Sequence, residues 1–296
     1  MSEHGTAEKT DSLIDNIEAF KKSVQKALRP PLRAKKGLEA MTHAGRLADD
    51  AAFSDAVRKL RRADLSCIDL EEQRQILLEQ IDTHLDRRKM RRRMMVLGEL
   101  DRRLSELDQS FEHLTDQPLT ISVGSLTVVI DLLKDRAEVR YARQTVTTTE
   151  ADAKSITTSL ESTRRTIRER TVESPRFFER LRQSYQVALT LSGGEEGDRV
   201  DLVDLLLPLA MISTPKEARR TKGLESLTPF PRYLLAYQLH RLRGDGCLQR
   251  DGLRIDLGTA TGDSTSDKAN VLFLPDSAGG GQYYLSIRFQ SAGTSS

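Results

Sequence analysis

The chain has 296 residues, of which 38% are hydrophobic, 5% aromatic and 30% charged, and it contains no tryptophan. This length allows two domains, with or without an extended helical arm. Lys and Arg number 46 against 44 Asp and Glu, a net charge of +2, which excludes a protein that attracts polyanions with its whole surface. Any basic surface must arise from local clustering of cations.

The cysteines and the apolar segments indicate the compartment. Cys67 and Cys247 are far apart in the sequence, and two cysteines do not make a disulfide scaffold, which favours a reducing compartment. The beginning of the chain lacks the apolar core of a secretory signal, and no stretch approaches the roughly 18 uninterrupted apolar residues of a membrane span. We therefore expect a cytoplasmic protein without membrane contact.

The N-terminal region, 1–118, is predicted to be helical. Its apolar spacing predicts a helix over 13–28 that ends at Pro30–Pro31, and a second helical region over 48–60. A much longer helix is expected over 70–115. Its last apolar residues alternate by three and four positions, the heptad pattern of a coiled coil or a long helical hairpin: Leu97, Leu100, Leu104, Leu107, Phe111 and Leu114.

The period of the apolar pattern changes at Pro118, and residues 119–172 predict a small β element followed by a connecting helix. Alternate residues are apolar in three runs: Leu119, Ile121 and Val123, then Leu126, Val128 and Ile130, then Val139 and Tyr141. A buried helix over 126–134 is the alternative, because a short apolar run fits either structure. Thr149 is the expected N-cap of the connecting helix.

The C-terminal region, 173–296, predicts three helices and several strands. Ser174–Pro175 begins the first helix, an almost wholly apolar second helix covers 202–211, and a third runs from Pro231 to Gly244 and Gly246. The expected strands are a minimal one at 199–200 and longer ones over 247–257, 270–275 and 282–289.

This order of elements resembles the winged-helix superfamily over about 174–290, and the ending Leu239, Leu242 and Gly246 is similar to a recognition helix that runs into a β-hairpin wing. The resemblance implies that the third helix enters the DNA major groove and that the wing contacts phosphates. The residues that would do so are Arg232, Gln238, Arg241 and Arg243 on the helix and Arg250 and Arg254 on the wing. Their guanidinium and amide groups can pair with base edges. Winged helices also dock proteins, and residues 229–296 hold seven Arg or Lys against six Asp, so both roles stay open.

The densest cluster of charge lies in the long helix, where six of the seven positions 87–93 are basic: Arg87, Arg88, Lys89, Arg91, Arg92 and Arg93. Helical spacing keeps several of these cations on one side, from which they can follow a phosphate backbone. The alternative is a solvated face that pairs with Glu71, Glu72, Glu99 or the acidic residues of a partner. Acidic residues are sparse within the run, so pairing inside the helix cannot neutralise it.

No motif predicts a catalytic site, a metal or a cofactor. LSGGE at 191–195 resembles the signature loop of ABC-type ATPases, but the chain has no GxxxxGK(S/T) loop to hold ATP, so a glycine turn between helices is favoured. The loop over 258–270 lacks the lysine of a phosphate cradle. No two histidines stand at metal-ligand spacing, and no small-molecule substrate is evident. We therefore expect a protein that is not an enzyme.

These patterns predict a mainly α fold with small β elements (α+β), in which a long helical or coiled-coil-like arm precedes a C-terminal winged-helix-like domain. The expected function is that of a non-enzymatic, DNA-associated subunit of a bacterial multi-protein complex, which contacts phosphates through the Arg-rich helix, with the winged helix as a second candidate contact. The helix over 70–115 would join the subunit to itself or to a protein partner. The alternative is an assembly subunit that docks on a partner, for example a chromosome-maintenance or defence ATPase, without touching DNA.

Overall fold

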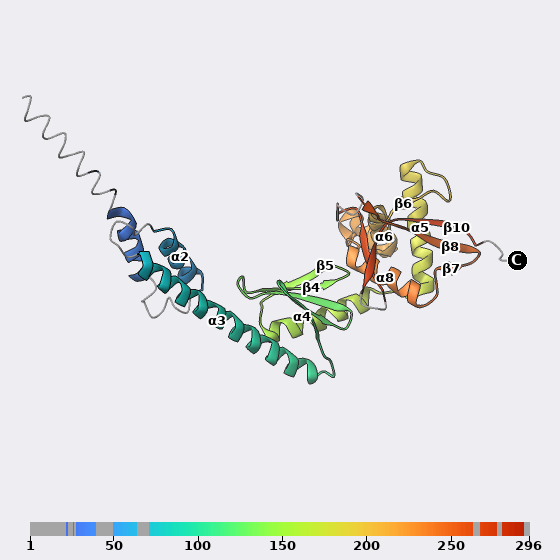
Figure 1. The fold of residues 1–296 in the computed structure, drawn as a ribbon. Coiled ribbons are helices and arrows are strands. Elements are labelled where there is room, and N and C mark those ends of the chain that lie inside the picture. The colour runs from blue at the N-terminus through green and yellow to red at the C-terminus, as the bar shows by residue number, and fades with distance from the viewer. Residues whose placement is uncertain are drawn as a thin grey trace, which may run out of the picture. The chain divides into compact units, whose positions relative to one another are not determined.

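The computed structural model describes residues 22, 26, 28–39, 50–63, 71–262, 267–276 and 280–292. The chain divides into two compact units, Met1–Met94 and Met95–Ser296, and the boundary between them falls inside the long helix α3, Glu71–Ser105 (Figure 1). Each unit has its own apolar core. The division of the chain at residues 118 and 172 stays a prediction.

The core of the N-terminal unit lies between α2, Asp50–Arg61, and the first half of α3, which run side by side in Figure 1. Phe53, Val57 and Leu60 of α2 are buried. They pack with a half-buried stripe on α3 that is formed by Leu77, Leu78, Ile81 and Leu85. Residues three and four positions apart share one face of a helix, so the stripe gives this part of α3 a single apolar side.

Residues 28–39 are helical, so the prediction that a helix ends at Pro30–Pro31 is wrong. Ala34 is 3% exposed and belongs to the same core as α2, and the backbone at Gly37 lies against Ala56. Packing of an apolar face outweighs the local cost of proline, because most helical stability in proteins comes from tertiary contacts. Most of the helix predicted over 13–28 lies outside the described residues.

The prediction of a long coiled-coil arm is wrong. α3 ends at Ser105; Leu107 lies in the turn that follows and is 39% exposed, and Leu114 lies in strand β1, Glu112–Asp116. Leu100 and Leu104 are at most 1% exposed and belong to the core of the C-terminal unit. The buried apolar residues of α3 therefore belong to two separate globular cores, and the predicted heptad residues are divided between a core, a turn and a strand.

The C-terminal unit begins with an antiparallel sheet whose strands follow one another in sequence order: β1, β2 Leu119–Val123, β3 Leu126–Asp131, β4 Arg136–Tyr141 and β5 Gln144–Thr149. The predicted alternation is confirmed, because the apolar residues that it placed on one face are all buried: Leu119, Ile121, Val123, Leu126, Val128, Ile130, Val139 and Tyr141. Ile121, Val128 and Val139 face one another across these strands, and each is 0% exposed. The alternative of a helix over 126–134 is wrong, since a period of two belongs to a strand.

Helix α4, Ala153–Arg170, covers the apolar face of this sheet (Figure 1). Its Ile156 and Leu160 are fully buried in the same core as the strands. The helix begins after Asp152 and not at the expected N-cap Thr149, which still belongs to β5. The Asp152 carboxylate accepts a hydrogen bond from the backbone N–H of Ser155 at 2.9 Å and so satisfies one of the free donors of the first turn.

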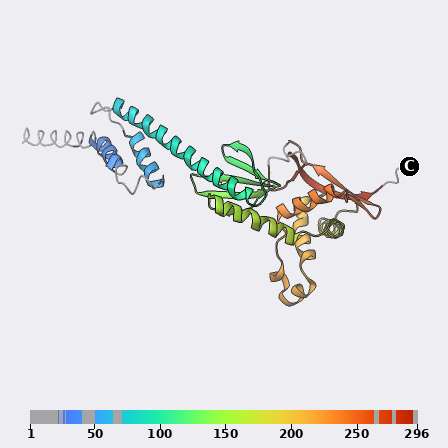
Figure 2. The ribbon, with the colours of Figure 1, turned by 90° about the horizontal axis from the view of Figure 1, so that it is seen from below.

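The rest of the C-terminal unit combines helices with a second antiparallel sheet. The helical elements are α5 Ser174–Ser192, η2 Leu202–Leu205, α6 Leu206–Ser213, α7 Lys216–Lys222, η3 Gly223–Ser226 and α8 Arg232–Gly244. The strands are β6 Val200–Asp201, β7 Gln249–Arg250, β8 Leu253–Thr259, β9 Leu272–Pro275 and β10 Gly281–Ser291. The long strand β10 pairs with β6, β8 and β9, and β7 pairs with β8. Figure 2 shows these strands alongside α8.

The prediction of a mainly α fold that ends in a winged-helix-like domain is therefore wrong. The described residues form a mixed α+β protein with two antiparallel sheets of five strands each, and the second sheet replaces the expected two-stranded wing. The third helix is enclosed, since none of the residues 232–243 of α8 is exposed and Leu235, Leu239 and Leu242 are buried in the core. A helix whose residues are all at least half-buried offers no free face for a DNA groove.

Candidate functional site

The Arg-rich segment, residues 87–93, lies within α3 as predicted from its helical spacing. At about 3.6 residues per turn, its six cations fall into three pairs, 87 with 91, 88 with 92 and 89 with 93, each pair one turn apart. With the preceding Asp86, the segment has six positive charges and one negative charge, a net charge of +5. So dense a charge creates a local positive potential on a protein that is nearly neutral overall.

The cations of the Arg-rich segment differ in their surroundings. Lys89 Nζ lies 3.6 Å from an Asp86 carboxylate oxygen, while Arg88, Arg92 and Arg93 are half-buried and take part in interactions of their own. Arg87 and Arg91 are exposed, and within the described part of the chain neither has a carboxylate oxygen within 4.0 Å. These two guanidinium groups are thus the ones that an external anion can reach most easily.

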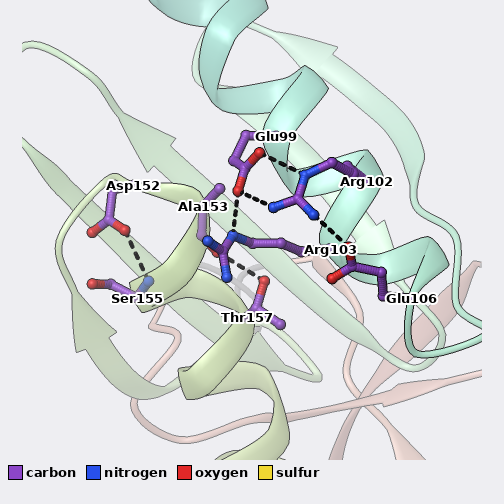
Figure 3. A network of polar contacts seen from close by, with 8 residues as sticks. All are labelled: Glu99, Arg102, Arg103, Glu106, Asp152, Ala153, Ser155 and Thr157. Carbon is purple, nitrogen blue, oxygen red and sulfur yellow. Dashed lines mark hydrogen bonds and ion pairs between the residues drawn. The ribbon is translucent and has the colours of Figure 1, made fainter.

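Two further arginines of α3, Arg102 and Arg103, have a different role. Arg102 donates hydrogen bonds to both carboxylate oxygens of Glu99, at 2.9 and 2.6 Å, and also contacts Glu106 (Figure 3). The hydrogen bond to Arg102 is the main reason that the pKa of Glu99 falls to about 2. Arg103 Nε lies 2.6 Å from the same carboxylate, as an ion pair without hydrogen-bond geometry. Two carboxylates therefore neutralise these cations, in contrast to Arg87 and Arg91.

The start of α4 lies beside these α3 residues, as Figure 3 shows. Burial raises the pKa of Asp152, but hydrogen bonds from Ser155 and Lys154 and the nearby charge of Arg103 lower it below its usual value overall. The Thr157 hydroxyl donates to the carbonyl of Ala153 at 2.8 Å. Arg103 therefore lies near the N-terminus of α4, where its charge acts on Asp152 within the C-terminal unit.

On α8, the residues that were expected to face DNA are held by internal contacts. Arg232 donates hydrogen bonds to the carbonyls of Ala269 at 2.7 Å and Lys268 at 3.0 Å, and to that of Val271. Burial lowers its pKa. Gln238 is 1% exposed, and its amide pairs with the backbone N–H and carbonyl of Val172 at 2.7 and 3.2 Å. The expectation that Gln238 reads a base is corrected, because its side chain already satisfies a buried peptide group.

The remaining candidates are Arg241 and Arg243 on α8 and Arg250 and Arg254 on the paired strands β7 and β8. Arg241 is 3.7 Å from Asp245, and Arg243 donates to the Tyr284 hydroxyl at 2.8 Å. Arg250 is 3.1 Å from Asp251 and 3.9 Å from Glu179. Arg254 is exposed on β8, with no carboxylate oxygen within 4.0 Å in the described residues. Apart from Arg254, these arginines have anionic or aromatic partners inside the protein, so they form no continuous cationic surface.

Sequence reasoning missed a cavity in the C-terminal unit that is lined by Arg170 and Arg180. The residues that line it come from several helices, and no sequence motif indicates that they form one site. Among the described residues, no group of three or more His, Cys, Asp or Glu could hold a metal ion. None of the described helices is long and apolar enough to cross a membrane.

Comparison with known proteins gives this chain no relative. No protein-family model matches it, and no curated protein and no solved structure matches it either.

Proposed function

We propose that the protein is a non-enzymatic, DNA-associated subunit of a cytoplasmic multi-protein complex in bacteria, and that it contacts the phosphate backbone through the Arg-rich segment of α3. The observation that carries the proposal is the exposed pair Arg87 and Arg91, for which the described part of the chain offers no carboxylate within 4.0 Å. Two like charges one helical turn apart repel each other in the free protein. A bound phosphate relieves this repulsion, and counterions released from the DNA add to the affinity.

The proposal leaves out the helix that was first expected to read DNA. Gln238 is buried and Arg232 is bound to backbone carbonyls, so neither has donors available for a base or a phosphate. Binding through α3 alone contacts phosphates and not base edges. We therefore expect binding that depends little on DNA sequence and strongly on salt.

The test is fluorescence anisotropy with a labelled random duplex over a range of salt concentrations. The double variant Arg87→Gln, Arg91→Gln removes two charges from an exposed helix face and leaves both apolar cores intact. Each lost phosphate contact reduces the slope of log affinity against log salt by about 0.9, so we expect the slope to fall by about 1.8. At low salt the affinity should fall roughly tenfold or more.

A matched control separates the segment from a general effect of charge. Arg165 and Arg168 are exposed on α4, one turn apart, and Arg165→Gln with Arg168→Gln changes the net charge by the same amount. This control should keep the wild-type salt slope. Equal losses in the two double variants contradict a specific role for α3. If the wild-type protein binds neither duplex nor single-stranded DNA at low salt, the proposal is refuted.

An assembly subunit that binds a protein in place of DNA is the second candidate. One observation favours it: Ile76, Met90 and Met94 are 50%, 56% and 68% exposed on the same side of α3 as Arg87. Exposed apolar side chains beside cations suit a protein surface that is both apolar and acidic. Met90→Ser with Met94→Ser should then abolish association with a co-purified partner, whereas the affinity for duplex DNA should stay within twofold of wild type.

A further inference from the structure

A cavity of about 340 Å³ lies in the C-terminal unit, where α4, α5, α6, α7 and α8 meet. Its wall includes Arg170 at the end of α4, Arg180 on α5 and Ser213 at the end of α6. Small-molecule sites in proteins have volumes of roughly 300–1,000 Å³, so this cavity has room for a compact ligand. It is independent of the Arg-rich segment, which belongs to the other unit.

The charge of the wall is positive. Arg170 and Arg180 stand against one carboxylate, Glu169, which leaves a net charge of +1. Arg170 Nη2 donates to the carbonyl of Pro229 at 2.8 Å, which holds this guanidinium group in place. Within the described part of the chain, no carboxylate oxygen lies within 4.0 Å of the Arg180 guanidinium group.

Arg180 is a cation that is partly withdrawn from water and lacks a counter-ion from the described residues. Burial lowers its pKa, and the neighbouring charge of Arg176 lowers it further. Removing a charge from water is costly unless an opposite charge or hydrogen bonds compensate. The Oγ of Ser213, at the wall of the same cavity, is buried and has no hydrogen-bond partner. A cation and a hydroxyl group that both lack partners at one cavity can both donate hydrogen bonds to a bound anion.

Another part of the wall is apolar. Phe230 and Leu234 line it, and both are largely buried. The ring of Phe230 stacks on that of Phe177, with centroids 6.4 Å apart and an angle of 16° between the planes. A ligand that fits therefore has an anionic end for the arginines and a compact apolar or aromatic body for the phenylalanine side.

We propose that this cavity binds a small phosphate monoester, whose phosphate group contacts Arg170 and Arg180 and whose apolar body packs against Phe230. A phosphate dianion offers three acceptor oxygens, and guanidinium groups match this geometry with paired hydrogen bonds. The positive charge of Arg176 nearby favours a dianion over a monoanionic carboxylate.

The test is isothermal titration calorimetry of the full chain with phenyl phosphate, benzoate and inorganic phosphate as probes. Wild type should bind phenyl phosphate most tightly of the three. Arg180→Met keeps the aliphatic part of the side chain, removes the charge and should weaken binding at least tenfold. The control is Arg182→Met, which makes the same change two residues further on α5, outside the cavity wall, and it should stay within twofold of wild type.

A second pair of measurements guards against misfolding. Without ligand, Arg180→Met should melt no lower than wild type, because it removes a charge that lacked compensation. Its melting temperature should no longer rise with phenyl phosphate. Ala218→Leu, which fills part of the cavity, should also abolish binding. The proposal is overturned if wild type shows no saturable binding up to about 10 mM, if benzoate binds more tightly, or if the control loses as much affinity as Arg180→Met.

Discussion

Truncation of Leu104 to alanine tests whether the second half of α3 belongs to a globular core. Leu104 is 1% exposed and packs in the core of the C-terminal unit. Leu104→Ala removes three carbons, which at about 0.8 kcal/mol each amounts to roughly 2.4 kcal/mol of lost burial. The cavity that remains raises the total to about 3–5 kcal/mol. For a unit of this size, such a loss lowers the melting temperature by about 6–20 °C.

The assay is urea denaturation followed by circular dichroism, with a separate transition fitted for each unit. Met94→Ala is the control on the same helix, since Met94 is 68% exposed and its truncation should change the stability by less than about 0.5 kcal/mol. A partner helix that packed along the whole of α3 would cover Met94 as well as Leu104, and its association would depend on protein concentration. A large loss for Met94→Ala, or unfolding midpoints that depend on protein concentration, would therefore refute the division of α3 between two cores.

Three further predictions concern the C-terminal unit. Glu99→Gln should make the stability fall less steeply on acidification, because the pKa of Glu99 is about 2 in the folded protein and 4.5 ordinarily. The stabilisation by Glu99 is therefore complete above pH 4.5 and disappears towards pH 2. Parallel acid-denaturation curves for the two proteins would contradict this. Asp152→Ala should cost about 1 kcal/mol in urea denaturation, since the Ser155 N–H loses its cap, whereas Asp152→Asn should cost less. Gly258→Ala should cost about 1–3 kcal/mol, because the new Cβ would collide with the Oγ of the buried Ser286 and lie 2.5 Å from Arg199 Nη1. An unchanged melting curve would show that both side chains move aside freely.

Local patterns determined the elements whose burial follows a simple period. The alternation of Leu119, Ile121 and Val123 predicted a strand with one buried face, and the structure confirms it. The Arg-rich segment was placed on a helix by the same kind of reasoning. A signal of this type was also overlooked: Asp251–Gly252 forms the turn between β7 and β8, with positive φ at both residues. Asp-Gly between two short strands is a strong hairpin sequence, so 247–257 is not one strand.

Partners far away in the chain decided the rest. The three-four spacing of Leu97, Leu100 and Leu104 is the same for a coiled coil and for a helix that packs on its own domain, and only the presence of the sheet and α4 selects the second. The sequence of α8 predicted a helix, but β9 and β10, which cover it, pair only in the folded chain. Gln238 and Arg180 show the two consequences. The buried Gln238, which was predicted to read a base, pairs instead with the backbone of Val172. Arg180, which no sequence motif indicates, lies at the wall of a cavity. Sequence periodicity specifies which face of an element is apolar, whereas tertiary packing specifies which other elements cover that face. The covering elements also remove some charged side chains from water, and this decides which charges remain available to a ligand.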